Sequence, residues 1–128
     1  MIPNMNYKEA ATMTVKECYN QIGADFNEVL ERLGTEGMIK KFAIKFLDDK
    51  SYDILVKSMQ DKDVNEAFRA VHTMKGICLN LGFGRLYTAS SELTEALRGG
   101  SMDGSDELYE HVKEEYNNTV EAIRGIDE

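Results

Sequence analysis

The chain has 128 residues, of which 42% are hydrophobic, and this length and composition are typical of one folded domain. Its 23 acidic and 15 basic residues give a formal net charge of −8, which disfavours binding to phosphate backbones and anionic lipid. We therefore expect one domain over residues 1–128, with residues 1–6 as a flexible tail, and neither nucleic acid nor membrane as a partner. No apolar run approaches the roughly 20 residues that span a bilayer, and the first residues lack a secretory signal, so we expect a cytoplasmic protein.

The elements that the sequence predicts are helices. Pro3 is the only proline, and most of the ten glycines stand between segments with helical periodicity. In chain order, the predicted helices cover Tyr7 to Ile22, Phe26 to Leu33, Met38 to Leu47, a continuation from Ser51 through Met59, Val64 to Leu81, Arg85 to Arg98, and a last segment after Ser105. Short connections between long amphipathic helices favour antiparallel neighbours. The sequence thus predicts an all-α fold, an up-down antiparallel four-helix bundle with a short additional N-terminal helix.

Polar residues that can accept hydrogen bonds from the first amides of a helix mark most of these starts. Asn6, Asp25 and Asp63 each precede a glutamate by three residues, which is the spacing of a capping box. Ser51 and Ser105 are the predicted caps of two further helices. These five residues are therefore the predicted helix starts.

The helix predicted from Val64 to Leu81 departs from local preferences beside one histidine. Its inward arc on a helical wheel consists of Val64, Ala67, Phe68, Val71, Met74, Cys78 and Leu81. His72 lies at the margin of this arc, and Lys75 stands beside the arc, where an aliphatic residue is usual. Gly76 follows four residues after His72, although a glycine within a helix costs about 1 kcal/mol relative to alanine. Such departures are expected where residues serve a function.

These three residues suit the transfer of a phosphoryl group. A neutral imidazole is a nucleophile, and the ordinary pKa of an imidazole, about 6.5, leaves much of it neutral at the pH of a cell. A phosphoryl group on His72 brings about two negative charges, which the ammonium group of Lys75 one turn away would attract. The missing side chain of Gly76 leaves a notch beside the ring through which another protein can approach. Such transfer needs mainly positioning and charge stabilisation, provided that a partner supplies the metal and carboxylates.

The residues around His72 resemble a known family. The run His72-Thr73-Met74-Lys75-Gly76 is similar to the H-x-[LM]-K-G signature of the histidine-containing phosphotransfer (HPt) domain of bacterial two-component phosphorelays. Further similarities are a short leader helix at 26–34, an F-x-x-x-F/L segment at 42–47, an acidic turn at 61–63 and an N-[LI]-G end at 80–82. The resemblance covers about residues 20–124, and the motifs occur in the order and spacing of that family.

This resemblance implies that His72 accepts a phosphoryl group from the aspartyl phosphate of a receiver domain and passes it to the aspartate of another receiver. It implies a phospho-carrier without ATP-dependent kinase activity and without a cofactor of its own, with magnesium held by the partner receiver domain. The expected partners are receiver domains of response regulators or hybrid histidine kinases. We expect a monomer because no second apolar stripe is evident.

The resemblance and the helical spacing also assign roles to residues around His72. Lys75 is expected to stabilise the phosphate and Gly76 to give the receiver access. The predicted receiver contacts are Phe68, Arg69, Thr73 and Leu79, which lie within one or two turns of His72. Small residues commonly follow the motif glycine in the family, whereas Ile77 and Cys78 follow it here, a difference expected to alter receiver choice or local packing.

Other interpretations stay open at this point. A bundle of the same fold can bind receivers as an adaptor that transfers no phosphate. A histidine kinase is disfavoured because the chain lacks a glycine-rich nucleotide-binding loop. A metal or haem bundle is weaker still, because the only histidines, His72 and His111, lie on different predicted helices, and Cys18 and Cys78 form no CxxC pair. We therefore expect no metal site, and expect His111 to be an ordinary solvated residue.

Overall fold

The computed structural model describes residues 13–127. In chain order it contains α2 (Val15–Gln21), α3 (Phe26–Leu33), α4 (Glu36–Lys45), the 3-10 turn η1 (Phe46–Asp48), α5 (Ser51–Gln60), α6 (Val64–Leu81), α7 (Gly84–Arg98) and α8 (Asp106–Arg124). The described part of the chain has no β-strand, only an isolated bridge between Met13 and Ile126. The predicted all-α fold is confirmed. None of the described helices has the length and apolar character needed to cross a membrane.

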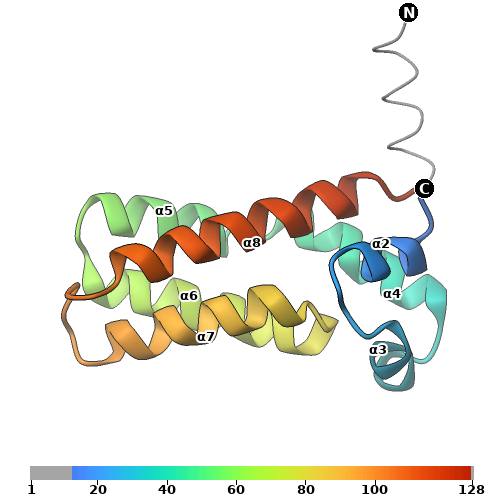
Figure 1. Ribbon diagram of the computed structural model, residues 1–128, viewed down its shortest axis with the longest axis horizontal. Helices are drawn as coiled ribbons and strands as arrows, with labels where there is room; N and C mark the ends of the chain where they lie inside the picture. Colours follow the sequence, from blue (N-terminus) through green and yellow to red (C-terminus); the bar gives the residue numbers. More distant parts are fainter. Residues whose placement is uncertain (1–12, 128) are drawn as a thin grey trace, which may run out of the picture.

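Four long helices form the body of the molecule. Helix α6 packs against α5 and α7, and α7 packs against α8, each pair running antiparallel (Figure 1). Tyr52 of α5 and Tyr116 of α8 stack with ring centroids 3.7 Å apart, which joins the remaining two helices. Helices α2, α3 and α4 gather at one end of this bundle, at the right of Figure 1. The predicted antiparallel four-helix bundle is therefore the observed architecture, but three helices of the described chain, α2 to α4, lie at its end where the sequence predicts one short additional N-terminal helix.

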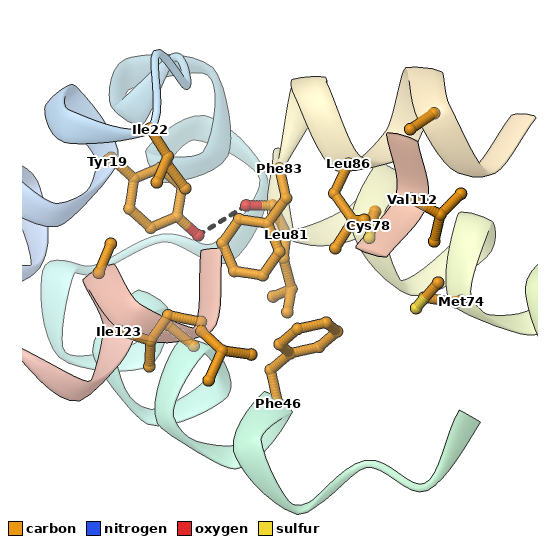
Figure 2. Packing of buried hydrophobic residues seen from close by; sticks show 14 of the residues in the cluster. Tyr19, Ile22, Phe46, Met74, Cys78, Leu81, Phe83, Leu86, Val112 and Ile123 are labelled. Carbon is orange, nitrogen blue, oxygen red and sulfur yellow. Dashed lines mark hydrogen bonds between the residues drawn. The ribbon is translucent and has the colours of Figure 1, made fainter. Parts of the chain in front are cut away.

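An aromatic cluster connects this end to the bundle. Tyr19 of α2 contacts Phe83 with ring centroids 5.6 Å apart, and Phe83 contacts Phe46 at 5.3 Å. The Tyr19 hydroxyl donates a buried hydrogen bond of 2.6 Å to the backbone oxygen of Leu81, the last residue of α6 (Figure 2). The C-terminal end of α6 is thus held by side chains from other elements.

Helices α3 and α6 begin and end at the predicted residues. The side chain of Asp25 accepts a hydrogen bond of 3.1 Å from the Glu28 amide at the start of α3. Asp63 accepts one of 3.2 Å from the Glu66 amide at the start of α6. Gly82 caps the end of α6 in the left-handed conformation, with φ of 74°. These side-chain caps fix where α6 starts and therefore the position of every residue along it.

The predicted N-terminal helix, Tyr7 to Ile22, is wrong at Met13 and Thr14, because the observed helix α2 begins only at Val15. Thr14 is extended and caps α2 through a reciprocal pair of hydrogen bonds with Glu17, of 2.8 and 3.1 Å. Met13 is paired with the opposite end of the chain, since its amide donates to Gly125 and its carbonyl accepts from Asp127. Both interactions require extended backbone, so the helix begins at Val15. The rest of the predicted start, Asn6 and Tyr7 to residue 12, and the predicted tail at 1–6 lie outside the described residues.

The predicted cap Ser51 is wrong, and Ser105 stands at the predicted N-cap position without a side-chain capping bond. Ser51 is the first residue of α5, and its amide donates to Asp49 instead of its hydroxyl accepting. Ser105 precedes α8, but its hydroxyl donates 2.7 Å to the Met102 carbonyl and makes no capping bond. Helix α4 begins at Glu36, two residues before the predicted start, because Thr35 accepts from the Met38 amide. In each case a competing local acceptor decides the hydrogen bonding.

The predicted inward arc of α6 is mostly buried. Ala67, Val71, Met74, Cys78 and Leu81 are in the core. Val64 and Phe68 are only half-buried, and Ala70 is buried although it was not in the predicted arc. Phe68 stays partly open because it lies near the surface shared by α6 and α7, which is where the candidate site is found.

Candidate functional site

His72 lies within α6 and is exposed to solvent. Its ring stacks on that of Phe68, one turn earlier, with centroids 5.7 Å apart and planes inclined by 4°. Neither ring nitrogen of His72 has a hydrogen-bond partner among residues 13–127. The stack therefore orients the imidazole and leaves its nitrogens available to a reactant.

Lys75 and Gly76 occupy the next turn of the same helix. Lys75 is half-buried, and within the described part of the chain its ammonium group forms no hydrogen bond or ion pair. Gly76 is exposed, and a Cβ built on it would meet no atom within 4 Å outside its immediate helix neighbours. Packing among residues 13–127 thus does not require a glycine at position 76, and the missing side chain leaves the backbone open beside His72.

Helix α7 adds two charged residues that the sequence analysis did not select. Arg98 donates from Nε to Glu95 Oε1 at 3.1 Å and from Nη2 to Glu95 Oε2 at 2.9 Å. The guanidinium carbon of Arg98 also lies 5.2 Å from the centre of the Phe68 ring, the ring on which His72 stacks. The Arg98 hydrogen bonds hold the pKa of the Glu95 carboxyl below its usual value, and the nearby Lys75 and His72 act in the same direction.

A sequence signal for Arg98 existed. Helices α6 and α7 are antiparallel neighbours joined by a short turn at Phe83, and Phe68 and Arg98 are equally far from Phe83 along the chain. Residues at equal distances from the turn of a helical hairpin lie at the same level. Applied to the predicted helices, this rule places Arg98 and Glu95 level with the turn of α6 that holds Phe68 and His72.

The structure places the other predicted receiver contacts at the surface of α6. Thr73 is exposed, and Leu79 is 55% exposed, which is unusual for a leucine. Arg69 is exposed too, but two hydrogen bonds, of 3.2 and 2.8 Å, pair it with Glu66. Thr73 and Leu79 are therefore accessible to solvent, whereas Arg69 already has a partner on its own helix.

A groove of about 590 Å³ lies beside the C-terminal half of α6. Its apolar walls come from Leu33 of α3, Phe42 of α4, and Ile77 and Leu81 of α6. Cys78, by contrast, is fully buried in the core, and burial raises the pKa of its thiol. The two departures from the family pattern therefore have different consequences, since Ile77 shapes a surface and Cys78 fills the interior.

His111 lies on α8 and has carboxylates on both sides. Its Nδ1 is 3.6 Å from Glu92 of α7 and its Nε2 is 3.6 Å from Glu115. His111, Glu114 and Glu115 form the one group among residues 13–127 whose ligand atoms are close enough to share a metal ion. Exposed acidic groups are common without a metal, so closeness alone assigns no metal ion to this group.

The family model described as the Hpt domain matches residues 17–124, which is most of the chain. No curated protein and no solved structure matches the chain. The matched range begins in α2, ends at the last residue of α8 and includes the whole surface around His72.

Proposed function

Because the chain belongs to the Hpt domain family, we propose that it is a phosphorelay intermediate in which His72 takes a phosphoryl group from the aspartyl phosphate of one receiver domain and passes it to the aspartate of another. Hpt domains take part in phosphotransfer in two-component signalling, interact with receiver domains, and are phosphocarriers rather than kinases. The proposal concerns which residue carries the group and how its neighbours assist.

The observation that carries the proposal is the surroundings of His72. An exposed imidazole, stacked on one face and without a hydrogen-bond partner in the described part of the chain, is free to act as a nucleophile. An unprotonated ring nitrogen attacks the phosphorus of the aspartyl phosphate, a nitrogen–phosphorus bond forms, and the bond from phosphorus to the aspartate oxygen breaks. The aspartate leaves as a carboxylate, and the other ring nitrogen releases its proton to solvent.

The neighbours of His72 supply charge and access. The Lys75 ammonium, without an ion-pair partner among the described residues, attracts the phosphoryl oxygens as they arrive. The open backbone at Gly76 lets the receiver bring its own aspartate and magnesium close to the ring. Phe68, Thr73 and Leu79 are the residues of α6 that we propose to contact the receiver, and Arg69 is a weaker candidate because Glu66 holds it.

The proposal is tested by transfer from phosphorylated receivers. Each receiver domain encoded by the same organism is loaded with radioactive phosphate, purified and mixed with the protein, and short-time rates are compared. We expect at least one receiver to label the wild-type protein with an acid-labile, alkali-stable phosphate, and His72→Gln to abolish the label. The matched control is His111→Gln, which removes the other histidine and should label normally.

The outcomes separate the proposal from its rivals. Label that persists in the His72→Gln protein contradicts the assignment of the acceptor. Label that appears with ATP and magnesium alone, without a receiver, indicates a kinase. Binding of receivers without label in the wild-type protein indicates an adaptor that has lost the chemistry.

A further inference from the structure

We propose that Glu95 is an anionic placeholder, which holds Arg98 beside His72 until His72 is phosphorylated, and that Arg98 then leaves Glu95 to bind the phosphoryl group. The inference rests on the proposed function of His72 and adds a positioning residue and a phosphate ligand from a second helix. The geometry that carries it is a chain of contacts from Glu95 to Arg98, from Arg98 to Phe68 and from Phe68 to His72.

Arg98 and His72 both contact the ring of Phe68. The Arg98 guanidinium lies 5.2 Å from the centre of the Phe68 ring, and His72 stacks on that same ring at 5.7 Å. A guanidinium offers two parallel donors, and it now uses Nε and Nη2 on the two oxygens of Glu95. Two oxygens of a phosphoryl group present the same fork, with more negative charge, so exchange of Glu95 for phosphate preserves the hydrogen bonds.

Glu95 is the carboxylate that the arriving phosphate would meet. Its pKa is lowered first by its hydrogen bonds with Arg98, and also by the charges of Lys75 and His72, so it shares their electrostatic surroundings. Before phosphorylation, the single negative charge of Glu95 is attracted by the positive charges of Lys75 and Arg98. After phosphorylation, about two more negative charges arrive and Glu95 repels them. Glu95 therefore keeps Arg98 in place in the resting protein and favours departure of the phosphate from the phosphorylated one.

The exchange has a small structural cost. The side chains of Arg98 and Glu95 are 53% and 60% exposed, and exposed ion pairs contribute little to folding stability. Substitutions of this pair should therefore leave the bundle folded and change mainly the properties of the phosphorylated histidine. This separates a role in phosphate binding from a role in packing.

The inference is tested on protein that has been phosphorylated chemically, without any receiver. Phosphoramidate donates its phosphoryl group to the histidine ring as its own phosphorus–nitrogen bond breaks and ammonia leaves. The lifetime of phosphorylated His72 and the pKa of its phosphoryl group are then followed by phosphorus-31 NMR at about 0.15 M salt, where distant charges are screened. Mass spectrometry of the wild-type protein and of His72→Gln verifies the labelled residue.

Opposite changes are expected for the two residues. Glu95→Gln should lower the pKa of the phosphoryl group by about 0.2 to 0.7 pH units, the range for one exposed charge, and lengthen its lifetime. Arg98→Gln should raise that pKa by a similar amount and shorten the lifetime. In the Arg98→Gln background, Glu95→Gln should have a smaller effect, because there is no guanidinium left for which glutamate and phosphate compete.

The chain contains a matched control pair on another helix. Glu110 and Lys113 of α8 are also three residues apart, form an ion pair of 3.2 Å, and place the lysine nitrogen 5.2 Å from the centre of the Tyr109 ring. Glu110→Gln and Lys113→Gln change the net charge by the same amounts as the site variants. Both should leave the phosphoryl pKa and its lifetime unchanged.

The results also distinguish this inference from the proposed function. If Glu95→Gln and Arg98→Gln behave as the α8 controls do while receivers still label His72, the placeholder is contradicted and the relay stands. If phosphoramidate labels His72 but no receiver does, the relay is contradicted. Equal changes in the site variants and in the controls indicate a general effect of net charge and also overturn the placeholder.

Discussion

Gly76 lies inside α6 and Gly82 directly follows it, and the two positions differ in whether the structure has room for a side chain. A Cβ at Gly76 would face open space, and its backbone is that of an ordinary helix interior. A Cβ at Gly82 would run into the side chain of Val29, and the φ of 74° at Gly82 disfavours every other residue type. Packing and backbone conformation within residues 13–127 therefore explain Gly82, whereas for Gly76 we propose the approach of a receiver.

A substitution at Gly76 should separate stability from activity. We expect Gly76→Ala to raise the free energy of unfolding by about 0.5 to 1 kcal/mol, because alanine favours the helix and meets no neighbour. Gly76→Gln should keep the helical content and slow transfer from a phosphorylated receiver, because the longer side chain fills the approach. Urea unfolding and short-time transfer rates measure the two effects, and an unchanged rate in Gly76→Gln would remove the access argument.

Residues that act across helices were the part of the site that the sequence analysis missed. His72, Lys75 and Gly76 share one helix, so their spacing alone brings them to one turn. Arg98 and Glu95 reach the same surface only because α7 folds back antiparallel onto α6. Sequence periodicity describes which way a residue faces on its own helix and carries no information on the neighbouring helix, so the pairing of helices had to be known first.

At the scale of helices, boundaries could be predicted where a side-chain acceptor and a glycine stop agreed. Helices α3 and α6 have an aspartate cap and end before Gly34 and Gly82, and both were predicted to the residue. Ser51 and Ser105 carry the same type of acceptor and do not cap. The Ser51 amide donates to the Asp49 side chain, and the Ser105 hydroxyl donates to the Met102 carbonyl. These acceptors come into reach only once the preceding turn has formed, so the sequence does not reveal this competition.

The end of α6 provides a prediction at this scale. Gly82→Ala should lower the free energy of unfolding by about 2 kcal/mol or more, since alanine both disfavours positive φ and collides with Val29. The measurement is urea unfolding followed by circular dichroism, with Gly76→Ala as the control of opposite sign. Equal stability of the Gly82→Ala and wild-type proteins would show that the turn after α6 can adopt another conformation.

At the scale of the whole molecule, α6, the helix that carries His72, is held by the bundle on its sides and by α2 to α4 at its C-terminal end. The long bundle fixes its sides, and the end formed by α2, α3 and α4 fixes its C-terminal end through Tyr19 and through Arg32, which donates to the Leu79 and Asn80 carbonyls at 3.0 and 3.1 Å. The bundle could be predicted from amphipathic helices with short loops. The attachment of α2 and α3 could not, because it depends on contacts between residues about fifty or more positions apart, such as the hydrogen bonds of Tyr19 and Arg32.

The two buried thiols make the stability of the folded protein decrease as the pH rises in the alkaline range. Cys18 and Cys78 are fully buried, and burial raises the pKa of Cys18 from 9.0 to about 11 and that of Cys78 further. The folded protein thus holds these protons more tightly than the unfolded chain does. The stability that they contribute is fully present below pH 9.0, where both states are protonated, and is lost as the pH rises through the folded-state values, because the unfolded chain ionises first.

We therefore expect the free energy of unfolding to fall above about pH 9, by up to about 1.4 kcal/mol per pH unit for each thiol. Replacing both cysteines by alanine should lower stability at pH 7, because two buried side chains shrink, and should make the alkaline decline shallower. Urea unfolding in a reducing buffer at pH values from about 7 to 10 compares the two proteins below most tyrosine ionisation. Parallel declines in the two proteins would mean that groups other than Cys18 and Cys78 control the alkaline behaviour, whereas converging curves assign it to these two buried thiols.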